Sequence, residues 1–399
     1  MNKVIIRKIV INFIKYMKNK LIKLLSILFI FVTNLSCAQF GETFIMEDKD
    51  IVSPDEINYD LELVHENDEI IWGIEFFEDN SILATVKSGK LIHYKNNGDE
   101  VLIKGLPKIY LRGQGGLMDI EFHPNFEKNN LLYLTYAYEK EEGKGGSTNV
   151  ARAKLENDSL VDFEVLYEAT EVSRRGQHFG GRLEFDNDGF LYFSIGDRGN
   201  RDVNPQDLKL DGGKVYRIND DGTIPKDNPF YNNPNAKKAI YSYGHRNPQG
   251  MFKHPVSGKI WTNEHGPKGG DEINIINKGL NYGWPKITYG INYSGTTITK
   301  NKSLPNMEQP LYYWIPSIAP SCFEFISTDR YSGWQGSLLA GALKFNYLER
   351  IVLDKNNKVV YREKIAEDLG RPRDVKESKD GYIHISIENK GIYKIVPRS

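Results

Sequence analysis

One unit recurs six times along the chain and limits what the chain can fold into. Each copy is an apolar, strand-like run ending in Phe or Val, followed by a polar turn and another strand-like run. Examples are MDIEFHPNFEKNNLLYLTY (118–136) and RLEFDNDGFLYFSIG (182–196). The anchors are Phe76, Phe122, Phe185, Phe252, Phe325 and Val375, separated by 46, 63, 67, 73 and 50 residues. Alternating apolar residues with Asp-Gly or Ser-Gly turns are typical of β-hairpins.

Each interval leaves room for one hairpin and two further short strands. The pattern therefore predicts an all-β protein, a six-bladed β-propeller with four-stranded antiparallel blades. A β-sandwich or two barrels remain the alternatives on pattern alone. The uneven spacing predicts long loops between strands, and such loops commonly carry function.

The first 38 residues differ from the rest of the chain. They contain seven Lys or Arg and no acidic residue, then an apolar run from Leu24 to Val32, then Ser36-Cys37-Ala38. This order is typical of an export signal peptide, which predicts a periplasmic or cell-surface protein. A lipoprotein anchored through Cys37 and a buried helix are the alternatives. We expect residues 39–60 to be a lead-in segment and 61–399 to form the propeller domain.

Removal of the leader would make the protein acidic. Lys plus Arg falls from 52 to 45 while Asp plus Glu stays at 53, so the net charge is about −8. An acidic domain without a basic run is a poor ligand for nucleic acid. Cleavage after Ala38 leaves Cys322 as the remaining cysteine, so no intramolecular disulfide is expected.

Three histidines stand apart from the other five. His178, His245 and His265 each lie in a loop rich in glycine and charged residues, namely GQHFGGR, YGHRNPQG and NEHGPKGGDE. Loops of successive propeller blades converge on one face, so these segments predict one shared site. A neutral histidine there can accept a proton near neutral pH. A lone loop histidine is more often structural, and the glycines are equally typical of tight turns.

Charged loop residues suggest two kinds of ligand. Basic residues cluster at Arg182, Arg198, Arg246, Lys344, Arg371 and Arg373, and guanidinium groups suit carboxylates. We expect about half of these arginines to pair with acidic residues of the protein itself. The stretch GPKGGDEINIINKGLNYGW (266–284) combines carboxylates with sharp bends, which favours Ca²⁺, although its spacing matches no EF-hand. The fingerprints of nicotinamide, P-loop, zinc-protease and serine-hydrolase sites are absent from the sequence.

The ordered motifs resemble one known family, the soluble sugar dehydrogenases that use pyrroloquinoline quinone (PQQ) and share the glucose/sorbosone dehydrogenase fold. The similarity runs over about residues 60–397, and it follows the aldose-dehydrogenase branch more than the classical glucose dehydrogenase branch. The motifs are GQGGL, GQHFGGRL, GDRGNRD, QDLKLDGGKVYRIN, DNPF, YGHRNPQG, NEHGPKGGDEIN, NYGWP, YGINYSG, YYW, GALK and RPRDV.

The resemblance implies a role for individual residues. It makes His178 the general base that takes the C1 hydroxyl proton of an aldose, which is oxidised to a lactone by hydride transfer to the quinone. The positions that match the PQQ-binding residues of the family are Gln114, Arg246, Asn247, Tyr293, Lys344, Arg371 and Arg373. The carbonyls of Gly266 and Pro267 match a Ca²⁺ site that polarises the quinone. Glu272 and Tyr282 match a second, structural Ca²⁺ site.

One residue departs from the family pattern, because Cys322 stands where a small residue, often glycine, is usual. No particular sugar is predicted for that reason. The expected partners are an aldose and an external electron acceptor, with no nucleic acid, for a monomer or homodimer. A calcium-dependent lactonase or hydrolase and a non-catalytic sugar-binding propeller are the competing hypotheses.

Overall fold

The computed structural model describes residues 51–54 and 58–398, and these residues are almost entirely β-structure. The helical elements are the one-turn helix α2 (Phe126–Asn129) and the 3₁₀ turn η1 (Asn204–Gln206). Within the described ranges, no helix has the length and apolar character needed to cross a membrane. The predicted leader and Cys37 lie outside the described residues, so both stay predictions.

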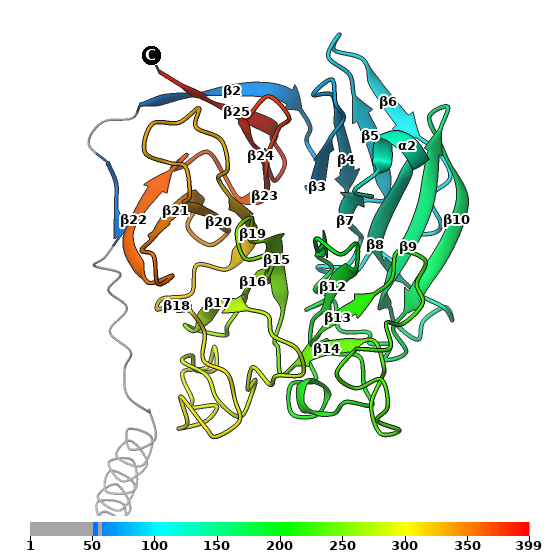
Figure 1. Ribbon diagram of the computed structural model, residues 1–399, viewed down its shortest axis with the longest axis vertical. Coiled ribbons are helices and arrows are strands. Elements are labelled where there is room, and N and C mark those ends of the chain that lie inside the picture. Colours follow the sequence, from blue (N-terminus) through cyan, green and yellow to red (C-terminus); the bar gives the residue numbers. More distant parts are fainter. Residues whose placement is uncertain (1–50, 55–57, 399) are drawn as a thin grey trace, which may run out of the picture. The chain divides into compact units, whose positions relative to one another are not determined.

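Six antiparallel sheets form the blades of a propeller, which confirms the predicted fold (Figure 1). Blade 1 contains β3 (Ile71–Phe76), β4 (Ile82–Val86), β5 (Lys90–Tyr94) and β6 (Glu100–Ile103). Blade 2 contains β7 (Leu117–Phe122), β8 (Leu131–Tyr138), β9 (Ser147–Glu156) and β10 (Ser159–Glu168). Blade 3 contains β11 (Leu183–Phe185), β12 (Leu191–Ile195), β13 (Lys214–Ile218) and β14 (Ile240–Tyr243).

The other three blades follow in chain order. Blade 4 contains β15 (Pro248–Lys253), β16 (Ile260–Glu264), β17 (Asp271–Ile275) and β18 (Tyr312–Trp314). Blade 5 contains β19 (Pro320–Phe325), β20 (Leu338–Ala342), β21 (Tyr347–Leu353) and β22 (Val359–Ile365). Blade 6 contains β23 (Pro372–Glu377), β24 (Ile383–Ile387), β25 (Gly391–Pro397) and β2 (Tyr59–Glu66).

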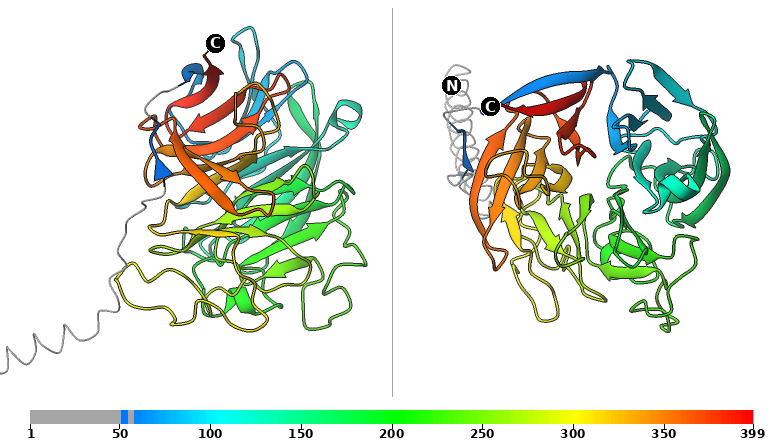
Figure 2. Two further views of the ribbon diagram at one scale, coloured as in Figure 1. Left: turned by 60° about the vertical axis from the view of Figure 1, so that its left-hand side comes forward. Right: turned by 45° about the horizontal axis from the view of Figure 1, so that its top comes forward.

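Two strands from the start of the described chain join the last two blades (Figure 2). Strand β2 pairs antiparallel with β25, from Tyr59 opposite Pro397 to Glu66 opposite Gly391, and so closes the ring. Strand β1 (Ile51–Val52) pairs parallel with β22 and gives blade 5 a fifth strand. Both strands cover a sheet edge that would otherwise be unpaired.

The repeated anchors all lie in the first strand of a blade, and these first strands surround the axis. Apolar packing lies mainly between neighbouring blades rather than within one. One cluster joins Leu83 and Leu91 of blade 1 to Leu134 of blade 2, and another joins Trp261 of blade 4 to Leu338 of blade 5. The hairpin repeat therefore reflects a unit that buries its faces only against the next copy.

Five of the six first strands (β3, β7, β15, β19 and β23) carry a β-bulge near their beginning. A bulge leaves a residue out of the ladder and re-aims its backbone and side chain. Trp72, Gln249 and Arg373 are such residues.

Arg182, which directly precedes β11, connects all six blades at the axis. Its guanidinium donates to Asp119 at 3.0 Å in blade 2 and to Asp374 at 2.8 Å in blade 6. It also donates to the bulge carbonyls of Gln249, Ser321 and Arg373, in blades 4, 5 and 6. The ring of Trp72, in blade 1, lies 4.3 Å from the guanidinium carbon. Arg182 itself is 4 % exposed.

We expect Arg182→Met to lower the free energy of unfolding by about 3–5 kcal/mol, because it leaves two buried carboxylates without their cation. Urea denaturation of the purified protein measures this change in the free energy of unfolding. The matched control is Arg330→Met, since Arg330 is exposed and donates to the carbonyl of Asp380. The control should change stability by about 0.5 kcal/mol or less. Equal losses in the two variants would contradict the role of the axial contacts.

Candidate active site

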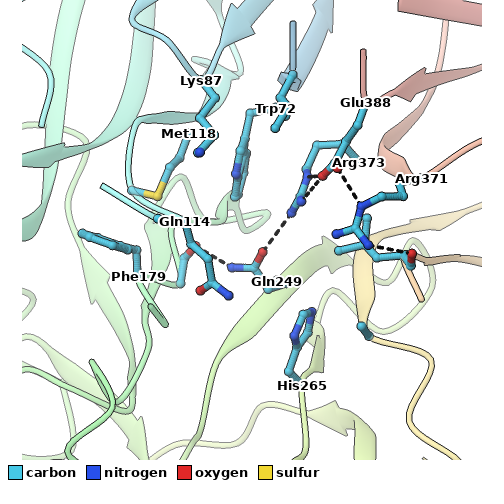
Figure 3. A pocket seen from close by; sticks show the side chains of 15 residues that line it. Trp72, Lys87, Gln114, Met118, Phe179, Gln249, His265, Arg371, Arg373 and Glu388 are labelled. Carbon is cyan, nitrogen blue, oxygen red and sulfur yellow. Dashed lines mark hydrogen bonds and ion pairs between the residues drawn. The ribbon is translucent and has the colours of Figure 1, made fainter. Parts of the chain in front are cut away.

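A cavity of about 380 Å³ lies at the end of the axis where the first strands begin (Figure 3). Bulge residues and the loops between blades supply its walls, so its lining comes from segments far apart in the sequence. The lining residues are Ile70, Trp72, Lys87, Gly113, Gln114, Met118, Phe179, Gly180, Gln249, His265, Ala319, Leu343, Arg371, Arg373 and Glu388.

One wall carries a fixed pair of guanidinium groups, on Arg371 and Arg373 of the RPRDV segment. Glu388, directly after β24, accepts from Arg371 Nε at 2.7 Å and from Arg373 Nε at 2.9 Å. Arg371 also donates to the carbonyl of Leu343 at 2.9 Å. Because one carboxylate holds two guanidinium groups, this wall keeps a net positive charge.

Lys87 adds a third cation to the same cavity. Burial and the nearby Arg373 lower the pKa of Lys87 below its usual value, while Glu388 opposes the shift. Burial raises the pKa of Glu388, but Arg373 and Arg371 outweigh burial and leave this pKa below its usual value. Glu388 is therefore ionised at neutral pH, and the wall suits a ligand with several carboxylates.

His178 and Asp197 form a buried pair beside the cavity. The two side chains meet through His178 Nδ1 and Asp197 Oδ1 at 2.6 Å, and their exposed fractions are 11 % and 1 %. Asp197 also accepts from the Trp284 indole N–H at 2.8 Å and from the Gly199 N–H at 2.7 Å. A carboxylate held by two N–H donors accepts from the histidine, so Nδ1 carries the proton and Nε2 keeps its lone pair.

Several effects set the protonation of this pair. Burial and the positive charge of Arg246 lower the pKa of His178, and the Asp197 contact only partly restores it. Burial raises the pKa of Asp197, but its hydrogen bond with His178 and the charges around it outweigh burial and leave this pKa below its usual value. At neutral pH the pair is thus a neutral imidazole on an ionised carboxylate.

The loop that carries His178 packs tightly against the loop that carries Gln114. Gln114 Oε1 accepts from the His178 backbone N–H at 2.6 Å, and the Gln114 N–H donates to the Gly176 carbonyl at 2.7 Å. Gly113, at φ +58°, lies so close to Gly176 that a side chain would collide with its backbone. His178 itself has φ +55° and does not line the 380 Å³ cavity, although Gln114, Phe179 and Gly180 do.

Arg246 and Asn247 lie behind this wall and are both buried. Arg246 donates to the His265 carbonyl at 3.1 Å and lies over the Trp284 ring at 5.4 Å. Asn247 Oδ1 accepts from the Gly180 N–H at 3.1 Å, whereas its buried Nδ2 has no hydrogen-bond partner among the residues that the structure describes. Buried amide donors are rarely left unpaired, so Asn247 leaves a donor for a polar ligand.

Of the seven predicted cofactor residues, Gln114, Arg371 and Arg373 line the cavity. Arg246 and Asn247 do not line it, and neither do Lys344 and Tyr293. Lys344 is exposed, and its ammonium lies over the Phe345 ring at 4.7 Å, whereas the preceding Leu343 lines the cavity. Tyr293 is 75 % exposed in the turn in which the Asn292 N–H donates to the Thr296 carbonyl. Their assignment to a cofactor stays a prediction.

The predicted calcium residues near Gly266 form an ordered bend. Asp271 accepts from the Gly266 N–H and the Ala319 N–H, both at 2.7 Å. The Pro267 carbonyl accepts from the Ser317 hydroxyl at 3.0 Å and keeps a second lone pair. No group of three or more His, Cys, Asp or Glu with metal-site geometry occurs in residues 51–54 and 58–398.

Glu272 and Tyr282 line a second, much smaller cavity of about 10 Å³ together with Glu264. This volume is near the minimum for one water molecule or ion. Burial and the nearby Glu264 carboxylate raise the pKa of Glu272 well above its usual value. The Tyr282 hydroxyl donates to the Ile275 carbonyl at 2.5 Å, which leaves the tyrosine ring as a wall of the cavity. Two carboxylates at one small cavity suit a cation.

His245 and His265, predicted to share the site with His178, have different environments. His245 is fully buried, with Nδ1 2.9 Å from Glu264 and Nε2 2.8 Å from Ser242. His265 donates from Nε2 to the Pro320 carbonyl at 2.7 Å and lines both cavities. Burial and Arg246 lower the pKa of His265 to about 3, so it stays neutral.

Cys322 does not alter the cavity. It is fully buried in β19, is not among the residues that line the 380 Å³ space, and packs beneath Gly341. The departure from the family pattern therefore lies in the packing between blades 5 and 6.

The comparisons with known proteins agree with this geometry. The family model described as glucose/sorbosone dehydrogenase matches residues 68–394. The chain belongs to this family. It is 40 % identical over 338 residues to aldose sugar dehydrogenase YliI of Escherichia coli (strain K12), which covers 82 % of this chain and 90 % of that protein.

Two further relatives support the same membership. Quinoprotein glucose dehydrogenase B of Acinetobacter calcoaceticus is 27 % identical over 417 residues, covering 82 % of this chain and 84 % of that protein. The crystal structure of the soluble aldose sugar dehydrogenase of Escherichia coli in its apo-form has a TM-score of 0.80 at 37 % identity. It covers 85 % of this chain and 100 % of that chain. The family and the propeller fold predicted from the motifs are thus confirmed.

The site residues that the sequence does not assign include Lys87, Asp197, Trp284 and Glu388. Asp197 and Trp284 lie inside two of the family motifs, GDRGNRD and NYGWP, so these motifs are a signal that could identify both residues. Lys87 and Glu388 lie in short polar turns after β4 and β24, where a charged residue ordinarily indicates exposure. Only the closed ring shows that these turns face the axis.

We expect Asp197→Asn to lower the pKa of His178 further, because it removes the carboxylate that favours the imidazolium. NMR titration of the His178 side chain measures this pKa in the protein without ligands. Asp188→Asn, in an exposed hairpin turn, is the control and should leave the His178 pKa unchanged. A pKa that rises in Asp197→Asn would contradict the proposed hydrogen-bond pair.

Proposed function

We propose that the protein is a PQQ-dependent dehydrogenase that oxidises the C1 hydroxyl of an aldose to a lactone. The observation that carries this proposal is a neutral histidine on an ionised aspartate, beside a cavity walled by three cations. Membership of the family, with aldose sugar dehydrogenase YliI at 40 % identity, supports the same reaction class. The name of the Acinetobacter relative, a quinoprotein, supports the cofactor class.

The residues present fit PQQ, a flat molecule with three carboxylates. Arg371, Arg373 and Lys87 provide the positive charge, and Gly113 and Gly180 leave room for close approach. Trp72 and Phe179 provide aromatic walls. The unpaired Asn247 Nδ2 offers a buried donor. When bound, PQQ supplies the two-electron acceptor for sugar oxidation.

The protein's own contribution to the reaction is proton transfer and positioning. His178 Nε2 accepts the C1 hydroxyl proton of the sugar while Asp197 stabilises the imidazolium that forms. Trp284 and the Gly199 N–H hold Asp197 in place, and Gln114 holds the His178 backbone. Glu388 holds Arg371 and Arg373 in orientations that can receive carboxylates.

Two calcium sites complete the proposal. The carbonyls of Gly266 and Pro267, held by Asp271 and Ser317, would hold one Ca²⁺, and this ion would supply a Lewis acid beside the cofactor. Glu272, Glu264 and the 10 Å³ cavity would hold a second, structural Ca²⁺. The leader predicts that this chemistry takes place outside the cytoplasm.

Reconstitution tests the function. We expect the purified protein to oxidise aldoses with a dye acceptor only after both PQQ and Ca²⁺ are added. Calcium-dependent hydrolysis without quinone would instead favour the lactonase, and sugar binding without turnover would favour the binding propeller. In His178→Ala, we expect PQQ absorbance to titrate normally and turnover to fall by about 10²–10⁴-fold.

The control for that variant is His254→Ala, since His254 accepts from the N–H groups of Val256 and Ser257 in a hairpin turn and does not line the cavity. Because the pKa of His178 is lowered, we expect wild-type turnover to persist below the ordinary histidine pKa of about 6.5. Unchanged turnover in His178→Ala, with PQQ bound, would reject His178 as the base.

The effect of calcium on thermal stability gives a test that needs no turnover. We expect CaCl₂ to raise the thermal unfolding temperature of the wild type, because an ion bound only by the folded state stabilises it. Glu272→Gln should lose most of this rise. Glu324→Gln, a carboxyl change elsewhere on the axis, should keep it. An equal calcium effect in Glu272→Gln and the wild type would exclude Glu272 as a ligand.

A further inference from the structure

Three exposed arginines, Arg112, Arg174 and Arg175, lie on the loops next to the catalytic pair. We call them the arginine rim. Arg112 Nε donates to the Arg174 carbonyl at 2.8 Å, and the Gln114 N–H donates to the Gly176 carbonyl at 2.7 Å. The loops of 112–114 and 174–178 are thus bonded side by side. The rim continues directly into Gln114, which lines the cavity, and into His178.

The rim arginines bond backbone carbonyls rather than carboxylates. Arg174 Nε donates to the Gly143 carbonyl at 2.7 Å, and Arg175 donates to the Gly199 carbonyl. Within the described chain, none of the three has an ion pair, although the sequence contains 53 Asp and Glu. Most other arginines do pair with acids, for example Arg152 with Glu164 and Arg350 with Glu363.

Each rim arginine is therefore oriented by one carbonyl and keeps further N–H donors for an outside acceptor. Arg112 and Arg174 use Nε, so both of their terminal nitrogens remain available. An oriented guanidinium loses less conformational freedom on binding a carboxylate than a mobile one. The loop of 139–144 alongside contains three glutamates and two lysines, so it adds no net positive charge to that of the rim.

The loops beneath the rim are joined by Arg198 and are partly apolar. Arg198 donates to the carbonyls of Gln177, Gly146 and Arg175 and lies over the Phe179 ring. Leu111 is 57 % exposed and Val172 is 46 % exposed, and each lies next to the rim in sequence. Exposed apolar residues bordered by arginines are typical of a protein-binding surface.

We propose that the arginine rim is the docking surface for an acidic protein that accepts single electrons. This proposal rests on the proposed dehydrogenase function. Oxidation of one aldose to a lactone releases two electrons and two protons. A one-electron carrier removes one electron per encounter, so two carriers dock in succession and the two protons pass to solvent. The rim adjoins the cavity, so a carrier bound there approaches the electron source.

The test compares two acceptors on the reconstituted enzyme. Plastocyanin, an acidic one-electron copper protein, serves as the protein acceptor, and a small neutral dye serves as the reference. We expect Arg112→Glu/Arg174→Glu/Arg175→Glu to lower kcat/KM for plastocyanin by at least tenfold at low salt. Turnover with the dye and binding of PQQ should stay within about twofold of the wild type, a bound that follows from the rim lying outside the cavity lining.

Two control variants separate charge at the rim from other effects. Lys226→Glu/Lys355→Glu/Lys358→Glu makes the same charge change on exposed lysines at turns at the other ends of the strands, and plastocyanin turnover should be retained. Arg112→Lys/Arg174→Lys/Arg175→Lys keeps the charge but removes the fixed geometry. This variant should retain much of the wild-type kcat/KM for plastocyanin, because the positive charge of the rim is unchanged.

Binding of the apo-protein to immobilised plastocyanin tests the surface without turnover. We expect binding that weakens as salt is added. Arg112→Glu/Arg174→Glu/Arg175→Glu should lose this binding, and Lys226→Glu/Lys355→Glu/Lys358→Glu should retain it. Loss in this assay, in a protein that never oxidises sugar, would support the surface and reject the dehydrogenase. Equal plastocyanin binding and turnover in the Glu variant and the wild type would overturn the proposal. Binding only to anionic lipid vesicles, with none to plastocyanin, would also overturn it.

Discussion

The structure depends on one buried guanidinium, that of Arg182, because it is the point at which all six blades meet. A ring of blades can close only if the groups that face its axis are satisfied, and water has little access there. Arg182 supplies the donors and the blades supply the acceptors, two carboxylates and three carbonyls. The carbonyls of Gln249, Ser321 and Arg373 are free to accept because each lies at a β-bulge.

The same bulges also build the cavity. A bulge residue leaves the alternation of the strand, so its carbonyl and its side chain can both turn towards the axis. The carbonyls of Gln249 and Arg373 accept from Arg182, and their side chains line the cavity. The Trp72 ring contacts the Arg182 guanidinium and also lines the cavity. The residues that line the cavity are thus the same bulge residues that bind Arg182 and join the blades, which explains why the site lies at the axis.

Charge along the axis makes the two ends of the propeller different. The cavity end carries Arg371, Arg373 and Lys87, whereas the last residues of the first strands carry a ring of carboxylates around Lys376. Burial raises the pKa of Glu184 to about 7 and that of Glu324 to about 8, although Lys376 opposes the shift in both. An anionic ligand therefore meets attraction at only one end of the axis.

The sequence predicts the correct fold, because a hairpin unit that cannot bury its faces alone and recurs six times favours a ring of blades over the sandwich and barrel alternatives. It also selects His178 and the Arg371 and Arg373 pair, and the structure places the two arginines in the cavity lining and His178 next to Phe179, which lines it. It was insufficient for Glu388 and Lys87, because their function comes from a turn of one blade facing another blade. For the same reason the sequence did not separate Lys344, whose side chain lies over Phe345, from its neighbour Leu343, which lines the cavity.

The protonation of His178 shows how the fold adjusts its own chemistry. Burial and Arg246 disfavour the imidazolium, and Asp197 favours it, with the first two prevailing. The contact with Asp197 alone would raise the pKa of His178 and favour the imidazolium, which cannot accept a proton. A histidine without the aspartate would accept one poorly, since each pKa unit corresponds to about 1.4 kcal/mol of stabilisation of the charged form. The two opposed charges therefore make His178 neutral at rest while leaving the imidazolium accessible, and both are placed there by loops of adjacent blades, 3 and 4.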